Sequence, residues 1–426
     1  MSNEQQLATS PDGKSAAARP APIDGARWRA RLAELIAKHK VPAAALGILS
    51  GGEIVDVAAG LLSKKTLVGA TPDSVFQIGS ITKVWTTTLI MQLVDEGKLT
   101  LDTPVAQIIP DFAVSDPQVS KQVTIRHLLT HTSGIDGDVF TDTGRGDDCL
   151  EKYVADMDTV AQNHPLGATF SYCNSGFSLA GRIIEVLTGK TWDAVLRERI
   201  IEPLGLTATV TLPEEAILHR AAVGHLGNPG EDPQPARLWQ LPRSAGPAGT
   251  ITARVHDLLE FAKMHLAGGL APDDSRILSQ KAADAMTQHE VDLPDPDVLG
   301  DSWGLGWIRF SWDGHRLFGH DGSTVGQGAF MRILPGAGIC GGVADQWWRR
   351  PRALPGPVRG DLRRPGGREH AGAVRAAGEP AVDRPATVRG HVFAGRRRRG
   401  VRDARRSVGA DHDTERGNGQ YRAGKP

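Results

Sequence analysis

The sequence contains few cysteines, no long apolar run and no excess of charge of either sign. Its three cysteines, Cys149, Cys173 and Cys340, are too few and too scattered for a disulfide framework, and neither they nor the 14 histidines show a metal-ligand spacing. No stretch of about 18 apolar residues is present to span a membrane. Because the 49 basic and 49 acidic side chains balance, the overall charge gives no reason to expect a nucleic-acid partner.

The N-terminal segment lacks the apolar core of a secretory signal. Residues 1–25 are polar and rich in Ala, Pro and Ser, which predicts a disordered tail. Together these absences favour a cytoplasmic protein with no metal, no organic cofactor, and no membrane or nucleic-acid partner. They leave the oligomeric state open.

Hydrophobic periodicity predicts an α+β fold in two domains. Apolar residues recur at helical spacing in 26–40, and two apolar runs flank Gly51-Gly52 as in a β-hairpin. Helical patterns then dominate, and strand-like runs return after Gly304. We therefore expect a sheet domain built from both ends of the chain, with a mostly helical domain inserted into it. The sheet domain comprises residues 26–75 and 254–340, and the helical domain residues 76–253.

The segment 341–426 departs from this pattern. Arginine supplies about one residue in five there, Gly and Pro are abundant, and isoleucine is absent, which is typical of disorder. Two interpretations are a solvated basic tail and a nucleic-acid arm. We favour a third, a change of reading frame, because the TGG-TGG codons of Trp347-Trp348 encode Gly-Gly, a plausible turn, when they are read one base later.

The first motif with catalytic potential is Ser80-Ile81-Thr82-Lys83, an S-x-x-K. A serine hydroxyl needs a base within hydrogen-bond reach to act as a nucleophile, and residues i and i+3 share a face of a helix. If a helix begins at Ser80, the Lys83 amine lies beside the hydroxyl, and burial would lower its pKa so that it accepts the proton. The alternative is an N-capping serine beside a solvated lysine.

The second motif, Tyr172-Cys173-Asn174, precedes an apolar helical pattern. A phenol near Lys83 would share the transfer of the proton, and the Asn174 amide is able to donate to an acyl carbonyl oxygen. The alternative is a helix start in which Asn174 or Ser175 is the cap and Tyr172 belongs to the core.

The third motif, His320-Asp321-Gly322-Ser323, closes a strand pattern. Gly322 would let a substrate backbone approach the strand edge, and the Ser323 amide would pair with the Ser80 amide as an oxyanion hole. The alternative is a turn between two strands, since Asp-Gly is a common turn pair. A second H-x-G, at His225, lacks a clear preceding strand.

In this chain order, the motifs resemble the S-x-x-K, Y-x-N and K/H-x-G set of the serine β-lactamase and penicillin-binding-protein superfamily. Class C β-lactamases, D-alanyl-D-alanine peptidases and family VIII carboxylesterases are similar in this respect. The flanks FQIGSITK, LLTHTSGI and GHDGSTVG agree, and the resemblance covers residues from about 30 to 339. It implies a β-lactamase/D-alanyl-peptidase-like fold, in which an antiparallel sheet is flanked by helices. It also implies a last strand and a C-terminal helix, which we expect to be missing or scrambled after Ile339.

The resemblance implies a role for each motif residue. Ser80 corresponds to the acylated nucleophile, Lys83 to its proton acceptor, and Tyr172 to the general base that also serves deacylation. The amide of Ser80 corresponds to one half of the oxyanion hole. The residues that correspond to substrate-binding positions are Asn174, His320, Gly322 and Ser323.

His320 and Asp321 determine the substrate that we expect. A lysine at position 320 would attract a substrate carboxylate, whereas a histidine with a pKa of about 6.5 is mostly neutral at pH 7. Asp321 would repel a carboxylate if its side chain faces the cleft. We therefore expect a small neutral molecule, a short-chain carboxylic ester, hydrolysed through an acyl-enzyme on Ser80. The alternatives are a β-lactamase or D-alanyl-D-alanine carboxypeptidase, and an inactive product whose basic tail binds nucleic acid.

Two other features compete for a role in the site. Ser302 lies in a G-x-S-x-G pattern typical of α/β-hydrolases, but no buried strand is predicted before it and no helix after it, so we reject it as nucleophile. Three tryptophans are candidates for an acyl pocket or for the core, and we favour the core. They are Trp239, Trp303 and Trp307.

Overall fold

An antiparallel sheet of eight strands is the main layer of the computed structural model, which describes residues 22–227, 231–296, 299–335 and 339–345. The strand order is β2-β1-β14-β13-β12-β11-β10-β9, so both ends of the described chain contribute to one sheet. The eight strands are β1 (Ala43–Ser50), β2 (Glu53–Gly60), β9 (Val291–Asp292), β10 (Ser302–Trp303), β11 (Ile308–Trp312), β12 (His315–Ser323), β13 (Gly328–Leu334) and β14 (Ile339–Asp345).

The N-terminal hairpin follows the sequence pattern. Gly51 and Gly52 both have positive φ, at 59° and 87°, and Ser50 pairs with Glu53 across the turn. Two consecutive left-handed residues match the right-handed twist of the flanking strands, which explains the Gly-Gly pair. The predicted hairpin is therefore present at the predicted residues.

Strand β14 differs from the expectation at the C-terminal end. We expected the last strand to be missing after Ile339, and the tail to begin at residue 341. Instead, β14 runs to Asp345 and pairs with β1 on one side and with β13 on the other. Backbone hydrogen bonds to two neighbours hold this strand whatever the composition of the residues that follow. The reading-frame hypothesis concerns residues that mostly lie outside the described ones.

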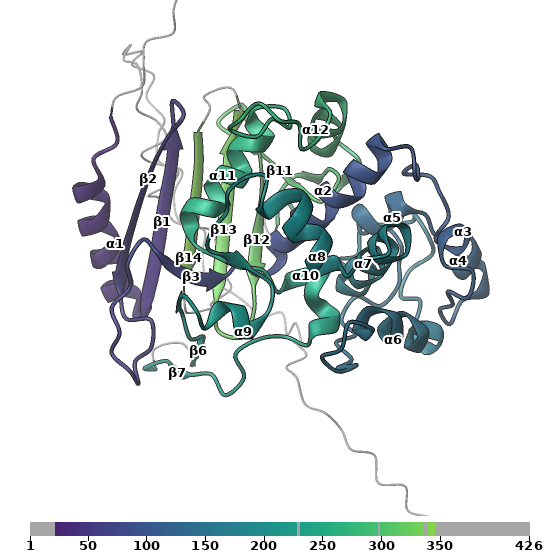
Figure 1. Ribbon diagram of the computed structural model, residues 1–426, viewed down its shortest axis with the longest axis horizontal. Coiled ribbons are helices and arrows are strands. Elements are labelled where there is room, and N and C mark those ends of the chain that lie inside the picture. The colour runs from purple at the N-terminus through teal and green to yellow at the C-terminus, as the bar shows by residue number, and fades with distance from the viewer. Residues whose placement is uncertain (1–21, 228–230, 297–298, 336–338, 346–426) are drawn as a thin grey trace, which may run out of the picture. The chain divides into compact units, whose positions relative to one another are not determined.

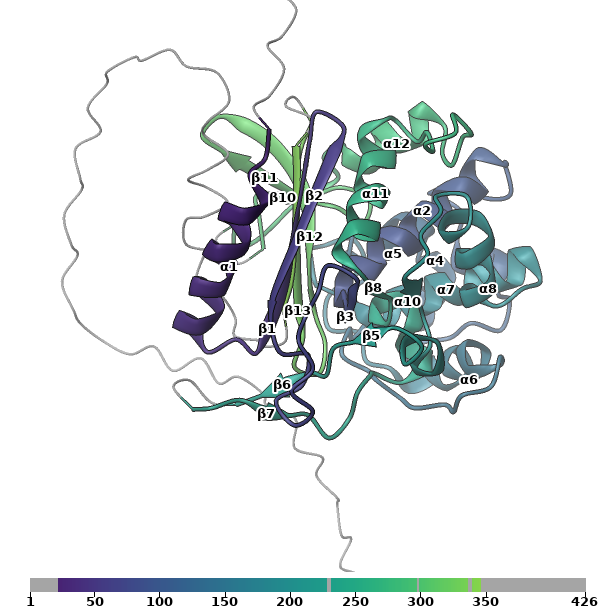
Figure 2. The same ribbon diagram turned by 60° about the vertical axis from the view of Figure 1, so that its left-hand side comes forward.

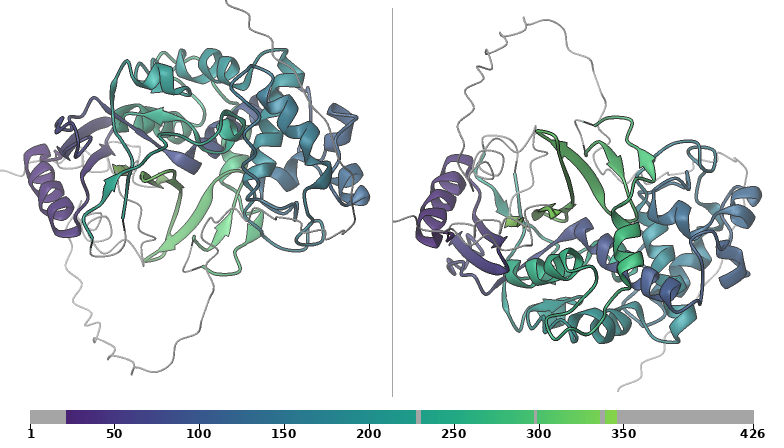
Figure 3. Two further views of the ribbon diagram at one scale, coloured as in Figure 1. Left: turned by 90° about the horizontal axis from the view of Figure 1, so that it is seen from below. Right: turned by 90° about the horizontal axis from the view of Figure 1, so that it is seen from above.

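Helices cover both faces of the sheet. Figure 2 shows α1 on one face and α11, α2 and α12 on the other. Figure 1 shows α3 to α8 and α10 gathered at the side of the sheet away from α1, and Figure 3 shows the purple α1 at the opposite end of the molecule from the blue helices. The helices are α1 (Gly25–His39), α2 (Thr82–Asp95), α3 (Val105–Ile108), α4 (Pro117–Gln122), α5 (Ile125–Leu129), α6 (Cys149–Ala155), α7 (Asn174–Thr188), α8 (Trp192–Leu196), α9 (Pro213–Ala216), α10 (Gly246–Gly249), α11 (Val255–Leu266) and α12 (Gln280–Thr287).

Two smaller sheets connect the helices to the main sheet. Their strands are β3 (Ser74–Gln77), β4 (Thr209–Val210), β5 (Arg220–Ala221) and β8 (Thr252–Ala253) in one, and β6 (His225–Leu226) and β7 (Gln234–Pro235) in the other. Strand β3 leads through a 3-10 turn, Gly79–Ile81, into α2. No helix in the described part of the chain is both long and apolar enough to cross a membrane.

Helix α2 runs through the centre of the core. Nearly all of its side chains are buried, and the Trp85 ring stacks on Phe261 of α11 with ring centroids 3.8 Å apart. A helix that is buried on nearly every side is packed on nearly every side. This packing fixes the position of the first turn of α2, which carries Lys83, and of the 3-10 turn before it, which carries Ser80.

We predict that Trp85→Ala lowers the free energy of unfolding by about 3–5 kcal/mol, because it leaves a cavity between α2 and α11. Urea unfolding followed by circular dichroism measures this change. Val186→Ala is the matched control, since Val186 is 42% exposed on α7 and should change the free energy by less than about 0.5 kcal/mol. Equal effects of the two substitutions would contradict the central role of α2.

Candidate active site

The structure brings Ser80 and Lys83 together. The Lys83 Nζ lies 3.1 Å from the Ser80 Oγ. The helix does not begin at Ser80, as the spacing suggested: a 3-10 turn carries Ser80, and α2 begins at Thr82. The side chains still meet because residues i and i+3 lie on one face in both a 3-10 turn and an α-helix, and this pair spans the junction of the two.

The turn before Ser80 requires glycine. Gly79 has φ +53°, in the left-handed region, and a Cβ atom at this position would lie 2.4 Å from the Ser323 amide nitrogen. Only a residue without a side chain adopts this conformation at no steric cost and lets β12 approach so closely. Gly79 thus permits the tight turn that leads from β3 into α2.

Lys83 is fully buried, which excludes the alternative of a solvated lysine. Its Nζ lies 2.7 Å from the Asn174 Oδ1 and 2.7 Å from the Ala248 carbonyl oxygen. Burial lowers the pKa of Lys83 to about 7, although the nearby acidic groups of Cys173 and Asp138 act in the opposite direction. A substantial fraction of the amine is therefore neutral at neutral pH.

The contacts of Lys83 also orient the neutral amine. The Asn174 Oδ1 and the Ala248 carbonyl oxygen are acceptors only, so each takes one of the two N–H bonds. The third contact is the Ser80 hydroxyl, which is able to donate. The lone pair of the neutral amine is consequently left for the Ser80 proton, as general-base catalysis requires.

Tyr172 completes a proton network around Ser80. The Ser80 side chain lies close enough to its hydroxyl to act on the pKa of Tyr172, and the Tyr172 ring centroid lies 4.9 Å from the Lys83 Nζ. Burial raises the pKa of Tyr172 above its usual value, and the interaction with Ser80 only partly offsets this effect. The phenol is therefore protonated at neutral pH and is able to donate.

Asn174 lies at the first residue of α7. Its Oδ1 accepts from Lys83, and its Nδ2 donates to the Asp138 carboxylate at 3.3 Å. The sequence suggested Asn174 or Ser175 as the alternative helix cap, but the Cys173 Sγ accepts from the Gly176 amide instead. The Asn174 side chain is thus available to the site.

The His320–Ser323 segment lies inside strand β12 and not in a turn. Gly322 pairs with Ala329 of β13, and Ser323 pairs with Gly328. His320 is buried, its Nδ1 lies 2.6 Å from the Asp321 carbonyl oxygen, and its ring meets Trp303 edge to face. Burial, together with the charge of Lys83, lowers the pKa of His320 to about 3. His320 is therefore neutral at physiological pH.

Two backbone amides flank the space in front of Ser80. A Cβ atom at Gly322 would lie 3.0 Å from the Ser80 amide nitrogen, and one at Gly79 would lie 2.4 Å from the Ser323 amide nitrogen. The two glycines thus let the Ser80 turn and β12 approach each other at their backbones. This proximity is the one that the predicted oxyanion hole needs.

The expected effect of Asp321 on the cleft is not found. Its carboxylate pairs with Arg332 of the neighbouring strand β13, with an Arg332 Nη2 to Asp321 Oδ2 distance of 3.1 Å. Successive residues of a strand point to opposite faces, so Asp321 and His320 face different sides of the sheet. The condition under which Asp321 would repel a substrate carboxylate is therefore not met.

The competing residues do not form a second catalytic site. Ser302 lies in the short strand β10, buried, and its Oγ accepts from the Arg309 Nη1 at 2.9 Å. His225 is buried in β6, away from Ser80, and its Nε2 accepts from the Lys64 amide. Trp303 and Trp307 are fully buried, and Trp303 packs under Tyr172 and His320.

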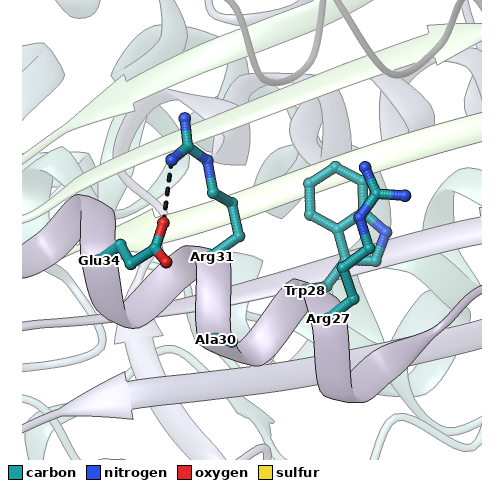
Figure 4. Close-up of a pocket in the computed structure, with 5 residues that line it drawn as sticks. All are labelled: Arg27, Trp28, Ala30, Arg31 and Glu34. Carbon is teal, nitrogen blue, oxygen red and sulfur yellow. Dashed lines mark hydrogen bonds and ion pairs between the residues drawn. The ribbon is translucent and has the colours of Figure 1, made fainter.

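The hollow shown in Figure 4 lies over α1 and is distinct from this cluster. Its lining contains an exposed ion pair between Arg31 and Glu34, with a nitrogen–oxygen distance of 3.0 Å, and no serine, cysteine or histidine. Among the described residues, no group of three metal-ligating side chains is present.

Three site residues were not singled out by the sequence patterns. The Ala248 carbonyl, the Asp138 carboxylate and the His131 ring all contact motif residues. His131 lies in the quoted flank LLTHTSGI, so a signal for it was present, whereas a main-chain acceptor such as the Ala248 carbonyl has no residue-type signature. Their proximity depends on loops that the pattern does not position.

Comparisons with known proteins match the whole segment that contains the three motifs. The beta-lactamase family model matches residues 28–353. Penicillin-binding protein 4 of Amycolatopsis lactamdurans is 47% identical over 335 residues, which cover 77% of this chain and 88% of that protein.

Solved structures with similar folds include a penicillin-binding protein homologue and an amidase. The octameric penicillin-binding protein homologue from Pyrococcus abyssi is 27% identical, with a TM-score of 0.64, over 76% of this chain and 74% of that one. The D-amino acid amidase from Ochrobactrum anthropi SV3, complexed with L-phenylalanine amide, is 25% identical, with a TM-score of 0.64, over 75% of this chain and 89% of that one.

We predict that Gly322→Ala slows the labelling of Ser80 by a serine-directed phosphonate by about a hundredfold, comparable with the loss of one oxyanion-hole donor. The added Cβ would lie 1.8 Å from the Ile78 carbonyl oxygen and would push β12 away from the Ser80 turn. Mass spectrometry of timed samples measures the rate. The control is Gly69→Ala, whose Cβ would have no neighbour within 4 Å. Labelling of Gly322→Ala at the wild-type rate would show that this close approach is unnecessary.

Proposed function

The chain belongs to the beta-lactamase family, and the proteins that it resembles include a D-amino acid amidase. We propose that it is a serine esterase that cleaves short-chain carboxylic esters through an acyl-enzyme on Ser80. The observation that supports the ester is the neutral His320 at the substrate-binding edge of β12. An edge without a cation offers no partner to a substrate carboxylate, whereas an uncharged acyl group needs none.

In acylation, the Ser80 Oγ attacks the ester carbonyl carbon and transfers its proton to the neutral Lys83 amine. The carbonyl oxygen becomes an oxyanion, which accepts hydrogen bonds from the Ser80 and Ser323 amides. When the carbon–oxygen bond to the alcohol breaks, the leaving oxygen takes the proton of the Tyr172 phenol. Tyr172 is then reprotonated by the Lys83 ammonium, so that the network returns to its starting charge.

In deacylation, the same groups activate a water molecule. The water attacks the acyl carbonyl carbon and gives one proton to Lys83, and the oxyanion again forms beside the Ser80 and Ser323 amides. Cleavage of the bond to the Ser80 Oγ releases the carboxylic acid. The Ser80 oxygen recovers a proton through Tyr172, whose hydroxyl interacts with the Ser80 side chain. Water adds across the ester bond, and no redox partner is needed.

Asp138 strengthens the preference for substrates without a negative charge. Its side chain is exposed and contacts Asn174, which in turn contacts Lys83. A carboxylate on the substrate near Asn174 would be repelled by Asp138, and the neutral His320 would not compensate. This replaces the argument from Asp321, whose charge is neutralised by Arg332.

An amide of an amino acid or peptide is the second candidate substrate. The relative from Amycolatopsis lactamdurans is named a penicillin-binding protein, and the Ochrobactrum anthropi protein is a D-amino acid amidase. Esters and amides pass through the same tetrahedral intermediate, so the site chemistry serves both. An ester releases an alcohol, whereas an amide releases an amine, which is more basic. Only a comparison of the two kinds of substrate separates the two candidates.

We predict that kcat/KM for p-nitrophenyl acetate exceeds that for a chromogenic cephalosporin, which carries a carboxylate, by more than about tenfold. Spectrophotometric assays of both substrates, and of D-phenylalanine p-nitroanilide, measure the preference. Ser80→Ala should reduce every rate to the background, because it removes the nucleophile. Faster turnover of the cephalosporin or the anilide would reject the esterase proposal while leaving Ser80 as nucleophile.

A further inference from the structure

His131 makes contacts around Tyr172 that the proposed reaction does not itself use. It follows α5, has φ +58° although it is not a glycine, and is fully buried. Few residues other than glycine adopt the left-handed region, although histidine does so more often than most, and those that do are held there by surrounding contacts. The contacts that hold His131 in this conformation therefore need to be identified.

Two hydrogen bonds join His131 to the residues on either side of Tyr172. The Ser171 amide donates to the His131 carbonyl oxygen at 2.7 Å, and the Cys173 amide donates to the His131 Nδ1 at 2.9 Å. One residue thus fixes the backbone immediately before and immediately after the phenol. The left-handed φ is what turns the carbonyl and the side chain of His131 toward the same segment.

The ring of His131 also packs on the Tyr172 ring. Their centroids are 4.3 Å apart and the planes are inclined by 25°, which is a stacked arrangement. On its other sides the imidazole meets Trp303 at 4.8 Å and Phe177 at 5.2 Å. The Tyr172 side chain is therefore held by a ring that itself has little room to move.

The hydrogen bond from Cys173 requires a neutral imidazole. An Nδ1 that accepts from an amide carries no proton, so the proton of the ring is on Nε2. Burial lowers the pKa of His131 well below its usual value, and the nearby Lys83 and His320 act in the same direction. The acceptor is consequently present over the whole range in which Lys83 titrates.

We propose that His131 is a positioning residue that holds the Tyr172 phenol against Ser80. The proposal rests on the role of Tyr172 in the proposed function. His131 touches neither the substrate nor the reacting atoms in this scheme. It acts by fixing the Ser171–Cys173 backbone, with the Cys173 hydrogen bond as the main contribution and the ring stacking as a smaller one.

Two substitutions separate these contributions. His131→Asn keeps an acceptor near the position of Nδ1 and tolerates the left-handed conformation, because asparagine is one of the few residues that do. His131→Phe keeps a stacking ring but leaves the buried Cys173 amide without an acceptor. For p-nitrophenyl acetate we expect kcat to fall about a hundredfold in His131→Phe and about tenfold in His131→Asn, with KM changed by less than about threefold.

A double-mutant cycle with Tyr172→Phe tests whether His131 acts through the phenol. Once the hydroxyl is removed, a residue that only positions it has nothing left to position, so either His131 substitution should cost less than about threefold in the Tyr172→Phe background. The same fold-loss in both backgrounds would overturn the proposal, because a general structural defect does not depend on the hydroxyl. So would a larger loss of kcat in His131→Asn than in His131→Phe.

Controls separate this proposal from the function on which it rests. His265→Phe removes another buried histidine, one that contacts Thr88 and Trp307 outside the site, and should leave kcat within about threefold. Urea midpoints show whether each variant is folded, and the asparagine variant completes the cycle if the phenylalanine variant does not fold. An unchanged kcat in Tyr172→Phe would reject the role of Tyr172 itself. If Tyr172→Phe lowers kcat while both His131 variants keep the wild-type kcat, only the positioning role of His131 would be rejected.

Discussion

The buried amine of Lys83 is the constraint on which the rest of the site depends. An ammonium ion is costly to remove from water, and this cost lowers the pKa of Lys83 to about 7. The surrounding structure satisfies the amine without adding a carboxylate in direct contact: it supplies the Asn174 Oδ1 and the Ala248 carbonyl oxygen. A carboxylate there would stabilise the charged form and remove the lone pair that Ser80 needs.

Packing of α2 maintains this arrangement. The Ala248 carbonyl accepts from Lys83, and the adjacent Pro247 carbonyl accepts from the Thr86 hydroxyl at 2.7 Å, so α2 and α10 are joined at two successive carbonyls. Thr88, which is also buried, satisfies its hydroxyl on the Val84 carbonyl of the same helix. Polar groups along α2 are thus paired while its apolar residues fill the core, which is how buried polar side chains are tolerated.

Local patterns predicted the elements and the motif residues because both depend on neighbours in sequence. The hairpin around Gly51-Gly52 and the meeting of Ser80 with Lys83 are of this kind. The direction of Asp321 and the contacts of His131 were not predicted, since they depend on Arg332 in a neighbouring strand and on a loop brought beside Tyr172. Strand β14 was missed because its pairing partners, β1 and β13, determine it more than its own composition does. The roles implied for the motif residues remain predictions; the geometry is consistent with those of Ser80 and Lys83, whereas the raised pKa of Tyr172 favours a proton donor over the implied general base.

The pH dependence of Ser80 acylation tests the central claim about Lys83 most directly. The burst rate with p-nitrophenyl acetate is measured by stopped flow from pH 5 to 9, with Ser80→Ala as the background. Raising the pH converts the ammonium to the neutral amine, so we expect the rate to rise with a midpoint of about 7, and Lys83→Met to lose both the rate and this pH dependence. A Lys83→Met protein with the wild-type rate, or a wild-type midpoint above 9, would contradict the claim that the buried amine activates Ser80.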